Sequence, residues 1–400
     1  MDLHNGSLFW PTTAAETFHE RKKLPIDDHY DVLIIGGGMS GALCAYTLLQ
    51  ENLKIALVDK RVMATGSSSA NTGLLQFSND IMLFELIEQI GEEKAVRFYK
   101  LCQSAIGQLE NIANTAAKDS DFIRRKSICF ASTDEDIKKV QKEYAVLKKH
   151  GFPVSYWTEE DMKQHLPFSK PAALITHGDA EVNPFTFVRG ILDYVEHKGG
   201  HLFENAEVTN VTEKKDHVSI ETSIGTFHAS QIIYAIGYET PPIGEKIGAD
   251  INRSYAIATQ PIDDLSEWEG RSLIWETKRP YLYMRTTADG RIIAGGLDED
   301  EPEAPQSEDW INNRAHRLKQ EIEKLFPMMD IQIAYAWGAS FGESLDNLPF
   351  IGKHPDKKRQ YYLLGYGGNG TVYSMLGSHI LKDLILQRPN PDAEIVKLDR

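Results

Sequence analysis

Three glycines and one aspartate carry the clearest chemical signal in this chain. Gly36, Gly38 and Gly41 form the spacing G-x-G-x-x-G, and Asp59 follows at the end of the next apolar run. Glycines with this spacing let a tight turn bring backbone N–H groups close to a pyrophosphate at the start of a helix. An acidic residue roughly 20 positions further on accepts hydrogen bonds from a ribose. The four residues together predict a dinucleotide site.

The residues around these glycines supply the elements that this chemistry needs. Val32 to Ile35 is a short apolar run, typical of a strand covered on both faces, and residues 42–50 continue at helical spacing. Residues 54–58 form a second apolar strand, so the order predicts a βαβ unit. The same stretch is apolar enough for a membrane span, but adjacent glycines each weaken a helix by roughly 1 kcal/mol. We therefore favour the turn.

Other stretches indicate which dinucleotide binds. Lys60 and Arg61 would suit the 2′-phosphate of NADP, whereas two segments favour a flavin. Residues 64–80, ATGSSSANTGLLQFSND, are rich in Ser, Thr and Gly, and suit close backbone approach to a phosphate and a ring. Residues 365–386, GYGGNGTVYSMLGSHILKDLIL, form a glycine-rich turn before a helix whose N-terminus stabilises negative charge.

With these segments the chain resembles the FAD-dependent D-amino-acid oxidase (DAO) superfamily, in its glycine oxidase, sarcosine oxidase and γ-glutamylputrescine oxidase branch. Besides the N-terminal fingerprint, the resemblance rests on GSSSANTGLL, EVNPFTFVRGILDYVEHKGGHLFENAEVTNV, HASQIIYAIGYET, YLYMRTTADGRIIAGGLDED and WGASFGESLDNLPFIGKHP, in this order before the final glycine turn. It implies an α/β fold in which a Rossmann-type FAD-binding domain is joined to a substrate domain with an antiparallel sheet.

Both domains are expected to be discontinuous in sequence. The FAD-binding domain is predicted from residues 30–80, 170–245 and 335–400, and the substrate domain from 81–169 and 246–334, after an N-terminal extension of residues 1–29. Helices are expected over 79–117, 134–150 and 311–326. The acidic, proline-bearing run 298–309 is expected to be a solvated loop that could cover a site entrance.

The resemblance also assigns flavin contacts residue by residue. Backbone at a helix start is expected to stabilise the negative charge that develops at the pyrimidine edge during hydride transfer. The implied contacts are Gly36, Gly38, Met39 and Ser40 to the pyrophosphate, with Gly41 packing the helix; Asp59 and Lys60 to the adenosine ribose; Val208 to the adenine; Gly237 near the phosphates; Ser67, Ser68, Ser69, Asn71, Thr72, Gly73 and Leu74 to the ring system; and Gly367, Gly368, Asn369, Gly370 and Thr371 to the pyrimidine edge.

The chain departs from the family at three places. Sarcosine oxidases attach FAD to a cysteine in the region of residues 335–345, which has none here, so non-covalent FAD is expected. Glycine and D-amino-acid oxidases hold the substrate carboxylate with an arginine where this chain has Phe341, so simple amino acids fit less well. Ile293 or Ala294 stands where sarcosine oxidases carry a lysine that assists oxygen. The electron acceptor, oxygen or a quinone or another redox partner, stays open.

One predicted strand supplies candidate substrate contacts. Alternation places Tyr281, Tyr283 and Arg285 on the same face. Arg285 is suited to a bidentate pair with a carboxylate and Tyr283 to orienting an amine, and with Phe341 they are the predicted substrate-binding residues. The alternative is that Arg285 is a structural arginine paired with an acidic residue. No catalytic residue is identified.

The predicted reaction is oxidation of a C–N bond in a small amine or amino acid by hydride transfer to flavin N5, after which water hydrolyses the imine. A fold alone does not fix chemistry, so two alternatives stay open. One is an FAD-dependent dehydrogenase of a 2-hydroxy acid or a polyol phosphate. The other is a flavoprotein subunit without turnover of its own.

Composition limits the classes of binding partner and the cellular compartment that we expect for this protein. Lys plus Arg number 43 and Asp plus Glu 58, and the net charge of -15 disfavours nucleic acid. Cys44, Cys102 and Cys129 lack C-x-x-C spacing and the histidines lack metal-ligand spacing, so no metal site is predicted. The N-terminus does not match a secretory signal, and a cytoplasmic protein without a transmembrane segment is expected.

Overall fold

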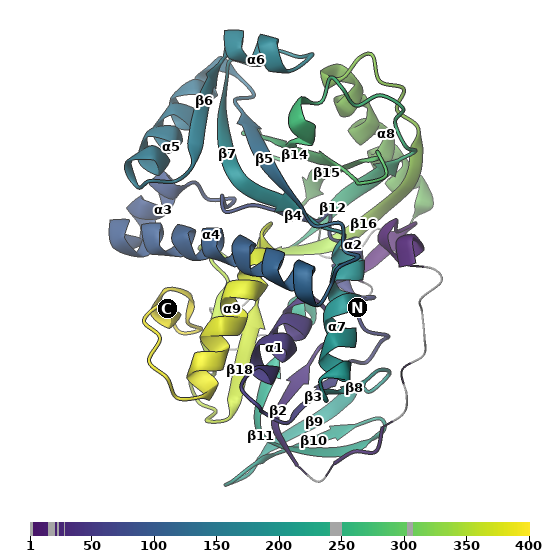
Figure 1. Cartoon of the computed structure of the whole chain (residues 1–400), viewed down its shortest axis with the longest axis vertical. Coiled ribbons are helices and arrows are strands. Elements are labelled where there is room, and N and C mark those ends of the chain that lie inside the picture. The colour runs from purple at the N-terminus through teal and green to yellow at the C-terminus, as the bar shows by residue number, and fades with distance from the viewer. Residues whose placement is uncertain (1–2, 15–20, 22–23, 28, 241–249, 302–306) are drawn as a thin grey trace.

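The computed structural model describes residues 3–14, 21, 24–27, 29–240, 250–301 and 307–400 (Figure 1). Their strands form two sheets, a larger one in the upper half of the view and a smaller one in the lower half. The long helix α4 (Glu92–Thr115) crosses between the two halves. The predicted fold class, a mixed α/β protein with a Rossmann-type unit and a second sheet, is confirmed.

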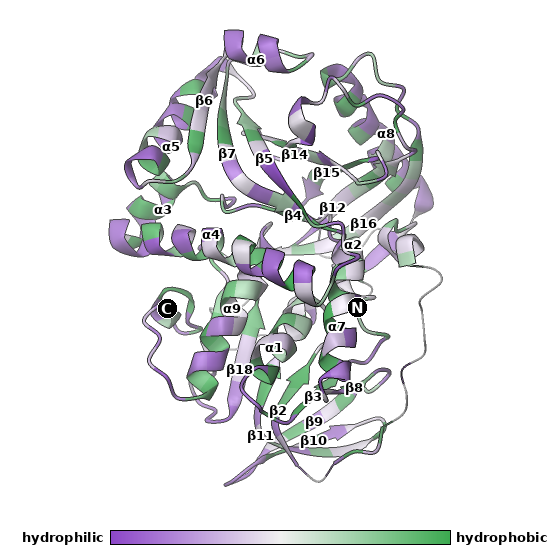
Figure 2. Cartoon of the chain, viewed as in Figure 1, coloured by the Kyte–Doolittle hydropathy of each residue, from purple (hydrophilic) through white to green (hydrophobic). Residues whose placement is uncertain are grey.

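The smaller sheet has a parallel centre. Its strands follow the order β17-β18-β11-β2-β3-β8, and β11 also pairs with a β9-β10 hairpin. Helices α1 (Met39–Leu49), α7 (Pro184–His197) and α9 (Gly370–Ile385) lie against it, and the central strands are apolar as a covered parallel sheet requires (Figure 2). The strands are β2 (Tyr30–Ile35), β3 (Ile55–Val58), β8 (His201–Phe203), β9 (Val208–Glu213), β10 (Val218–Thr222), β11 (Gly225–Tyr234), β17 (Phe350–Lys353) and β18 (Gln360–Leu364).

The larger sheet follows the order β1-β16-β12-β15-β14-β13-β5-β7-β4, with β6 also paired to β7. Its described pairs are antiparallel apart from β5 with β13. The strands are β1 (His4–Gly6), β4 (Leu74–Leu75), β5 (Ile123–Phe130), β6 (Val154–Thr158), β7 (Ala172–Glu181), β12 (Asp250–Thr259), β13 (Leu273–Glu276), β14 (Leu282–Thr286), β15 (Ile292–Glu299) and β16 (Ile333–Glu343). Helices α5 (Ile137–Lys149) and α8 (Glu308–Leu325) pack on it.

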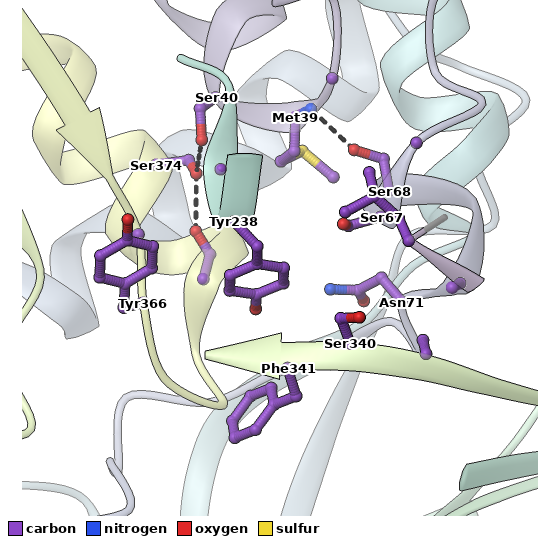
Figure 3. Close-up of a pocket in the computed structure, with 18 of the residues that line it drawn as sticks. Met39, Ser40, Ser67, Ser68, Asn71, Tyr238, Ser340, Phe341, Tyr366 and Ser374 are labelled. Atoms are coloured by element: carbon purple, nitrogen blue, oxygen red, sulfur yellow. Dashed lines mark hydrogen bonds between the residues drawn. The ribbon is translucent and has the colours of Figure 1, made fainter. Parts of the chain in front are cut away.

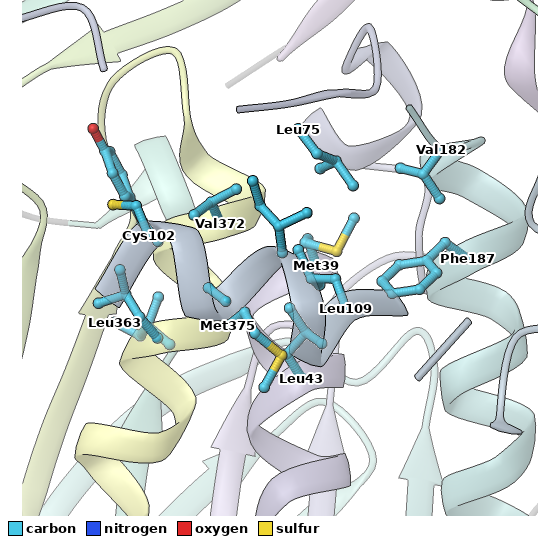
Figure 4. Packing of buried hydrophobic residues seen from close by; sticks show 14 of the residues in the cluster. Met39, Leu43, Leu75, Cys102, Leu109, Val182, Phe187, Leu363, Val372 and Met375 are labelled. Atoms are coloured by element: carbon cyan, nitrogen blue, oxygen red, sulfur yellow. The ribbon is translucent and has the colours of Figure 1, made fainter. Parts of the chain in front are cut away.

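A continuous apolar core joins the helices of the two halves. Figure 4 shows Met39 and Leu43 of α1 beside Leu109 of α4, Phe187 of α7 and Met375 of α9. All five side chains are buried. Because close-packed interiors transmit displacement, this core fixes the start of α1 relative to the start of α9.

Sheet membership differs from the predicted domain boundaries. Strand β7 lies in the range 170–245 and β16 begins before residue 335, yet both belong to the larger sheet. The same holds for β4, which lies within 30–80, and for β1 in the N-terminal extension. The local sequence predicts that a strand forms, but it does not predict which of the two sheets the strand joins.

The predicted helices are present with altered ends. The range 79–117 divides into α3 (Leu83–Ile90) and α4, because Gly91 between them adopts φ +88°. The range 134–150 begins with a 3₁₀ turn before α5, and α8 starts at Glu308 rather than 311. Of the expected acidic loop 298–309, residues 302–306 lie outside the described residues, whereas 298 and 299 are the last residues of β15.

Candidate functional site

A cavity of about 680 Å³ is lined by both sheets. The smaller sheet contributes the turn after β2, the end of β3 and the turn before α9, and the larger sheet contributes residues of β12, β13, β14, β15 and β16. Residues 66–80, which connect the two sheets, supply a third part of the wall. The cavity is thus built where the two halves of the molecule meet.

The turn after β2 can be made only by glycine at two positions. Gly36 adopts φ +108°, and a Cβ there would lie 2.4 Å from the carbonyl oxygen of Ala235. A Cβ on Gly41 would lie 1.8 Å from the carbonyl oxygen of Gly36. Carbonyl oxygens of this backbone cannot move aside, so the glycine spacing lets helix α1 start directly at the strand end.

The starts of helices α1 and α9 meet at this cavity. The Met39 N–H donates to Ser68 Oγ over 2.9 Å, and the Ser40 and Ser374 hydroxyls hydrogen-bond each other at 2.8 Å (Figure 3). The first N–H groups of a helix have no partner within it and carry partial positive charge. Two such ends side by side are suited to a ligand with several negative charges.

Hydrogen bonds from the turn that leads into α9 to residues 76–80 hold this turn in place. The Asn369 side-chain N–H donates to the Gln76 carbonyl oxygen over 2.7 Å, and the Gly368 N–H donates to Asp80 Oδ2 over 2.8 Å. Gly367, at φ +100°, allows the chain to reverse before the helix. The backbone of this turn is therefore fixed before any ligand binds.

The end of the cavity beside β3 carries a buried acid. Asp59 accepts hydrogen bonds from the Gly37 N–H at 2.6 Å and the Arg61 N–H at 2.7 Å, and burial raises the pKa of its carboxyl group. Lys60 and Arg61 both contact Glu239, at 2.8 and 2.7 Å. Burial of Glu239 opposes them, but their hydrogen bonds lower its pKa to about 2. Both cations are thus engaged by Glu239, which does not favour the NADP alternative.

Another part of the cavity wall is aromatic and acidic. Trp275, Tyr281 and Tyr283 line it, with ring centroids 6.4 Å apart for the first pair and 5.6 Å for the second. Asp80 and Asp298 line the same end. Burial raises the pKa of Tyr283, so its hydroxyl stays protonated at neutral pH, and burial together with the charge of Asp80 raises the pKa of Asp298.

Most of the residues predicted from the sequence line this cavity. Those that do are Gly36, Gly38, Met39, Ser40, Asp59, Lys60, Ser67, Ser68, Asn71, Thr72, Leu74, Val208, Gly237, Tyr283, Phe341, Gly367, Gly368, Asn369, Gly370 and Thr371. Four predicted residues do not line the cavity: Gly41, Ser69, Gly73 and Arg285. Gly41 packs α1 on the turn, the Ser69 hydroxyl donates to the Gly66 carbonyl oxygen over 2.7 Å, and Gly73 packs against the Val182 carbonyl oxygen.

Arg285 does not line the cavity, and the structure contradicts its predicted contact with a substrate carboxylate. It is 1% exposed, and its guanidinium donates to the carbonyl oxygens of Thr72 at 2.8 Å and Val182 at 2.7 Å. Glu181 lies 3.8 Å away and the Trp10 ring 4.9 Å away. Alternation predicted the correct face, but two residues advance a strand by about 7 Å, which takes Arg285 past the cavity. It supports the wall from behind.

Several lining residues were missed by sequence reasoning. Tyr238 stacks on Tyr366 with centroids 5.9 Å apart and meets the Phe341 ring edge-on at 6.5 Å (Figure 3). The acidic run 298–309 predicts a solvated loop, yet Asp298 lies in strand β15, one residue before its end. The signal that could have placed Asp298 is the strand pattern of RIIAGGLDE, which runs through to the acids.

The fold and this cavity define a class of protein: a dinucleotide-binding unit whose glycine turn faces an antiparallel substrate sheet, as in flavin-dependent oxidoreductases. Sequence comparison makes this specific, since the family described as FAD dependent oxidoreductase (DAO) matches residues 31–384. The chain belongs to this family. It is an FAD-dependent oxidoreductase, and the resemblance inferred from its sequence is confirmed.

Individual relatives agree with this assignment. Glycine oxidase of Geobacillus kaustophilus is 21% identical over 89% of this chain and 93% of its own length. Gamma-glutamylputrescine oxidoreductase of Escherichia coli is 24% identical, covering 89% and 83%. The crystal structure of the Geobacillus kaustophilus glycine oxidase superposes with a TM-score of 0.79, at 19% identity, over 94% of this chain and 99% of that chain. Among the described residues, none of the helices is both long and apolar enough to cross a membrane.

The residues at the glycine turns fit FAD. The start of α1 lines the cavity where a pyrophosphate is expected, the start of α9 lines it where the pyrimidine edge of a flavin is expected, and Asp59 lies after the end of β3 where a ribose is expected. Polar groups left without a hydrogen-bond partner among the described residues, including Gln76 Nε2 and Ser340 Oγ, line the space between. Buried polar groups are normally satisfied, so these atoms indicate a ligand that contacts them.

Proposed function

We propose that the protein oxidises a C–N bond of a small amine or amino acid with non-covalent FAD as the cofactor. The observation that carries this proposal is that Tyr281, Tyr283 and Asp298 line the same cavity as the starts of helices α1 and α9. A molecule bound between them would lie against polar and aromatic side chains on one side and the cofactor on the other. The glycine oxidase and gamma-glutamylputrescine oxidoreductase relatives bear names of this substrate class.

The neutral amine loses a hydride from carbon and a proton from nitrogen to water. Water then adds to the imine and releases a carbonyl compound together with ammonia from a primary amine, or an amine from a secondary one. Bound FAD supplies the two-electron acceptor for the hydride. The electrons pass from there to oxygen or to a quinone or other redox partner.

The protein's own residues orient the substrate and protect the reaction. The protonated Tyr283 hydroxyl can hydrogen-bond the amine nitrogen, which favours its neutral, reactive form. Trp275 and Tyr281 present apolar surface that keeps water from the reacting carbon. The N–H groups at the start of α9 stabilise negative charge that develops beside them.

Non-covalent binding is supported by where the cysteines lie. Cys44, Cys102 and Cys129 are all buried in the core, and none of them lines the cavity. A thioether to the cofactor would require one of them to leave its packed position.

Anaerobic mixing tests this function. FAD-loaded protein is mixed with an amine (butylamine), two amino acids (glycine and N-methylglycine), a 2-hydroxy acid (lactate) and a polyol phosphate (glycerol 3-phosphate), and loss of flavin absorbance is followed. Bleaching by amines or amino acids, but not by the last two, is expected. Bleaching only by lactate or glycerol 3-phosphate would contradict the proposal, as would a flavin that dithionite reduces but none of the five compounds does.

A further inference from the structure

We define the acidic end of the cavity by five residues that line it, Asp80, Asp298, Trp275, Tyr281 and Tyr283. This end holds two carboxylates, and the proposed function places the substrate there. Asp80 is already engaged, since Oδ2 accepts from the Gly368 N–H and Oδ1 accepts from the Tyr281 hydroxyl at 3.1 Å. The Asp298 carboxyl group has a hydrogen bond from the Ser254 side chain, but its Oδ1 is inaccessible to water and has no hydrogen-bond partner among the described residues.

No cation of the described residues lines this end of the cavity. Among the described residues that line the cavity, Lys60 and Arg61 are the only basic side chains, and both contact Glu239 at the other end. Arg279 approaches from outside: it is exposed, donates to the main-chain oxygen of Asp80 at 3.1 Å and lies 4.5 Å from the Tyr281 ring. Glu343, a further acid close by, does not line the cavity. A substrate carboxylate would find no basic side chain on the described wall here.

Unsatisfied hydroxyl groups show independently that a polar ligand belongs in the cavity. Ser78, two residues before Asp80, is 9% exposed, and Ser340 is 4% exposed. Both line the cavity, and neither Oγ atom has a hydrogen-bond partner among the described residues. Ser340 appears in Figure 3 between Asn71 and Phe341. Hydroxyls buried in this way cost stability unless a ligand contacts them.

From this arrangement we infer that the substrate is an amine without a carboxylate that carries a second amino group, which Asp298 and Asp80 recognise as an ammonium while the reacting amine is neutral. The inference rests on the proposed function and names its substrate class. An ammonium bound at this end of the cavity would pair with the charge of the Asp298 carboxylate. The faces of Trp275 and Tyr281 attract cations as well.

The test uses three molecules of matched length that differ at one end: butane-1,4-diamine, butylamine and 4-aminobutyrate. Binding of each to FAD-loaded protein under anaerobic conditions is measured as a perturbation of the flavin spectrum, and tetramethylammonium and acetate are added as probes that cannot form an imine. The two molecules without a carboxylate, and tetramethylammonium, are expected to bind at least about tenfold more tightly than 4-aminobutyrate and acetate.

Two variants locate the contact. Asp298→Asn keeps the size of the side chain and should raise Kd for butane-1,4-diamine about 10- to 100-fold, with FAD content and melting temperature unchanged. Glu343→Gln removes a nearby charge that does not line the cavity, and should change Kd less than about threefold. Equal losses in both variants would assign the effect to the general field and overturn the contact with Asp298.

The outcomes separate this inference from the function on which it rests. Tighter binding of acetate or 4-aminobutyrate than of the cations would overturn the inference, and if amino acids still bleached the flavin the proposed function would stand. An unchanged Kd in folded, FAD-loaded Asp298→Asn would also overturn it. If the cations bind as expected but no amine or amino acid bleaches the flavin, the proposed function fails, and the inference fails with it as a statement about substrate.

Discussion

The two ends of the cavity are lined by different kinds of group, backbone at one end and side chains at the other. The end proposed for the cofactor is lined by the backbone turns at Gly36 and Gly367 and by the helices that start beside them. The acidic end proposed for the substrate is lined by side chains such as Tyr283 and Asp298, which come from separate strands of the larger sheet. A backbone site requires glycines at fixed spacing, whereas a side-chain site imposes no local pattern.

The largest effect is expected from a substitution that disrupts the glycine turn at the end proposed for the cofactor. Gly41→Ala places a Cβ 1.8 Å from the Gly36 carbonyl oxygen, so α1 must shift and the FAD-binding turn must open. We expect a loss of about 3 kcal/mol or more in the free energy of unfolding and of at least about 100-fold in FAD affinity. Chemical denaturation and flavin fluorescence titration measure the two. Gly107→Ala, in α4, is the control, since its nearest neighbour would be 3.9 Å away.

Arg285→Ala acts on the wall of the side-chain end. It leaves the carbonyl oxygens of Thr72 and Val182 unpaired and removes the cation beside Glu181, so the free energy of unfolding should fall by about 2–4 kcal/mol. Urea denaturation checks this. Arg388→Ala, which removes a surface pair with Glu51, should lower the free energy of unfolding by far less.

These two arginine variants also decide between the two interpretations of Arg285. A stable Arg285→Ala protein that loses activity only toward carboxylate substrates would restore the original prediction of a substrate contact. General loss of stability, equal for all substrates, supports the role behind the wall.

Glu143, near the acidic end of the cavity, should make the free energy of unfolding depend on pH. It is buried on α5, and its carboxylate accepts from the N–H groups of Leu83 at 2.8 Å and Phe84 at 3.1 Å, just after the segment that carries Asp80. Burial raises its pKa to about 7 in spite of these bonds. A raised folded pKa means that stability is present below the unfolded pKa and is lost as pH rises to about 7.

Glu143→Gln does not titrate, so it should lose less stability than the wild type between pH 4.5 and about 7. We expect the difference in unfolding free energy between the two proteins to change by on the order of 2 kcal/mol over this range. Urea denaturation at a series of pH values gives the curve. Parallel curves for the two proteins would exclude Glu143 as the titrating group.

The smallest effect is expected from substitution of Asp59, a side chain at the end proposed for the cofactor. Asp59→Asn keeps one oxygen acceptor but loses the charge that holds the Gly37 and Arg61 N–H groups. FAD affinity should fall about 5- to 10-fold, and Asp59→Ala should lower it further. Titration of the apoprotein with FAD measures both. A loss as large as that of Gly41→Ala would contradict the view that backbone dominates this end.

The same contrast explains what could be predicted from sequence. The glycine turn, helix α1 and Asp59 are local in the chain, so their spacing predicted both the βαβ unit and its ligand. The sheet to which β7 or β16 belongs depends on partners far away in sequence. Asp298 and Ser340 meet the cavity only because β15 and β16 both pair with β12, and no pattern within either strand records that pairing.

The most direct test of the account is the absorption spectrum of the purified protein before and after acid precipitation. The account predicts a yellow protein with a flavin spectrum, about one FAD per chain, and release of all the FAD into the acid supernatant with a colourless pellet. A colourless protein that binds a nicotinamide nucleotide instead, or flavin that stays on the precipitated chain, would contradict it.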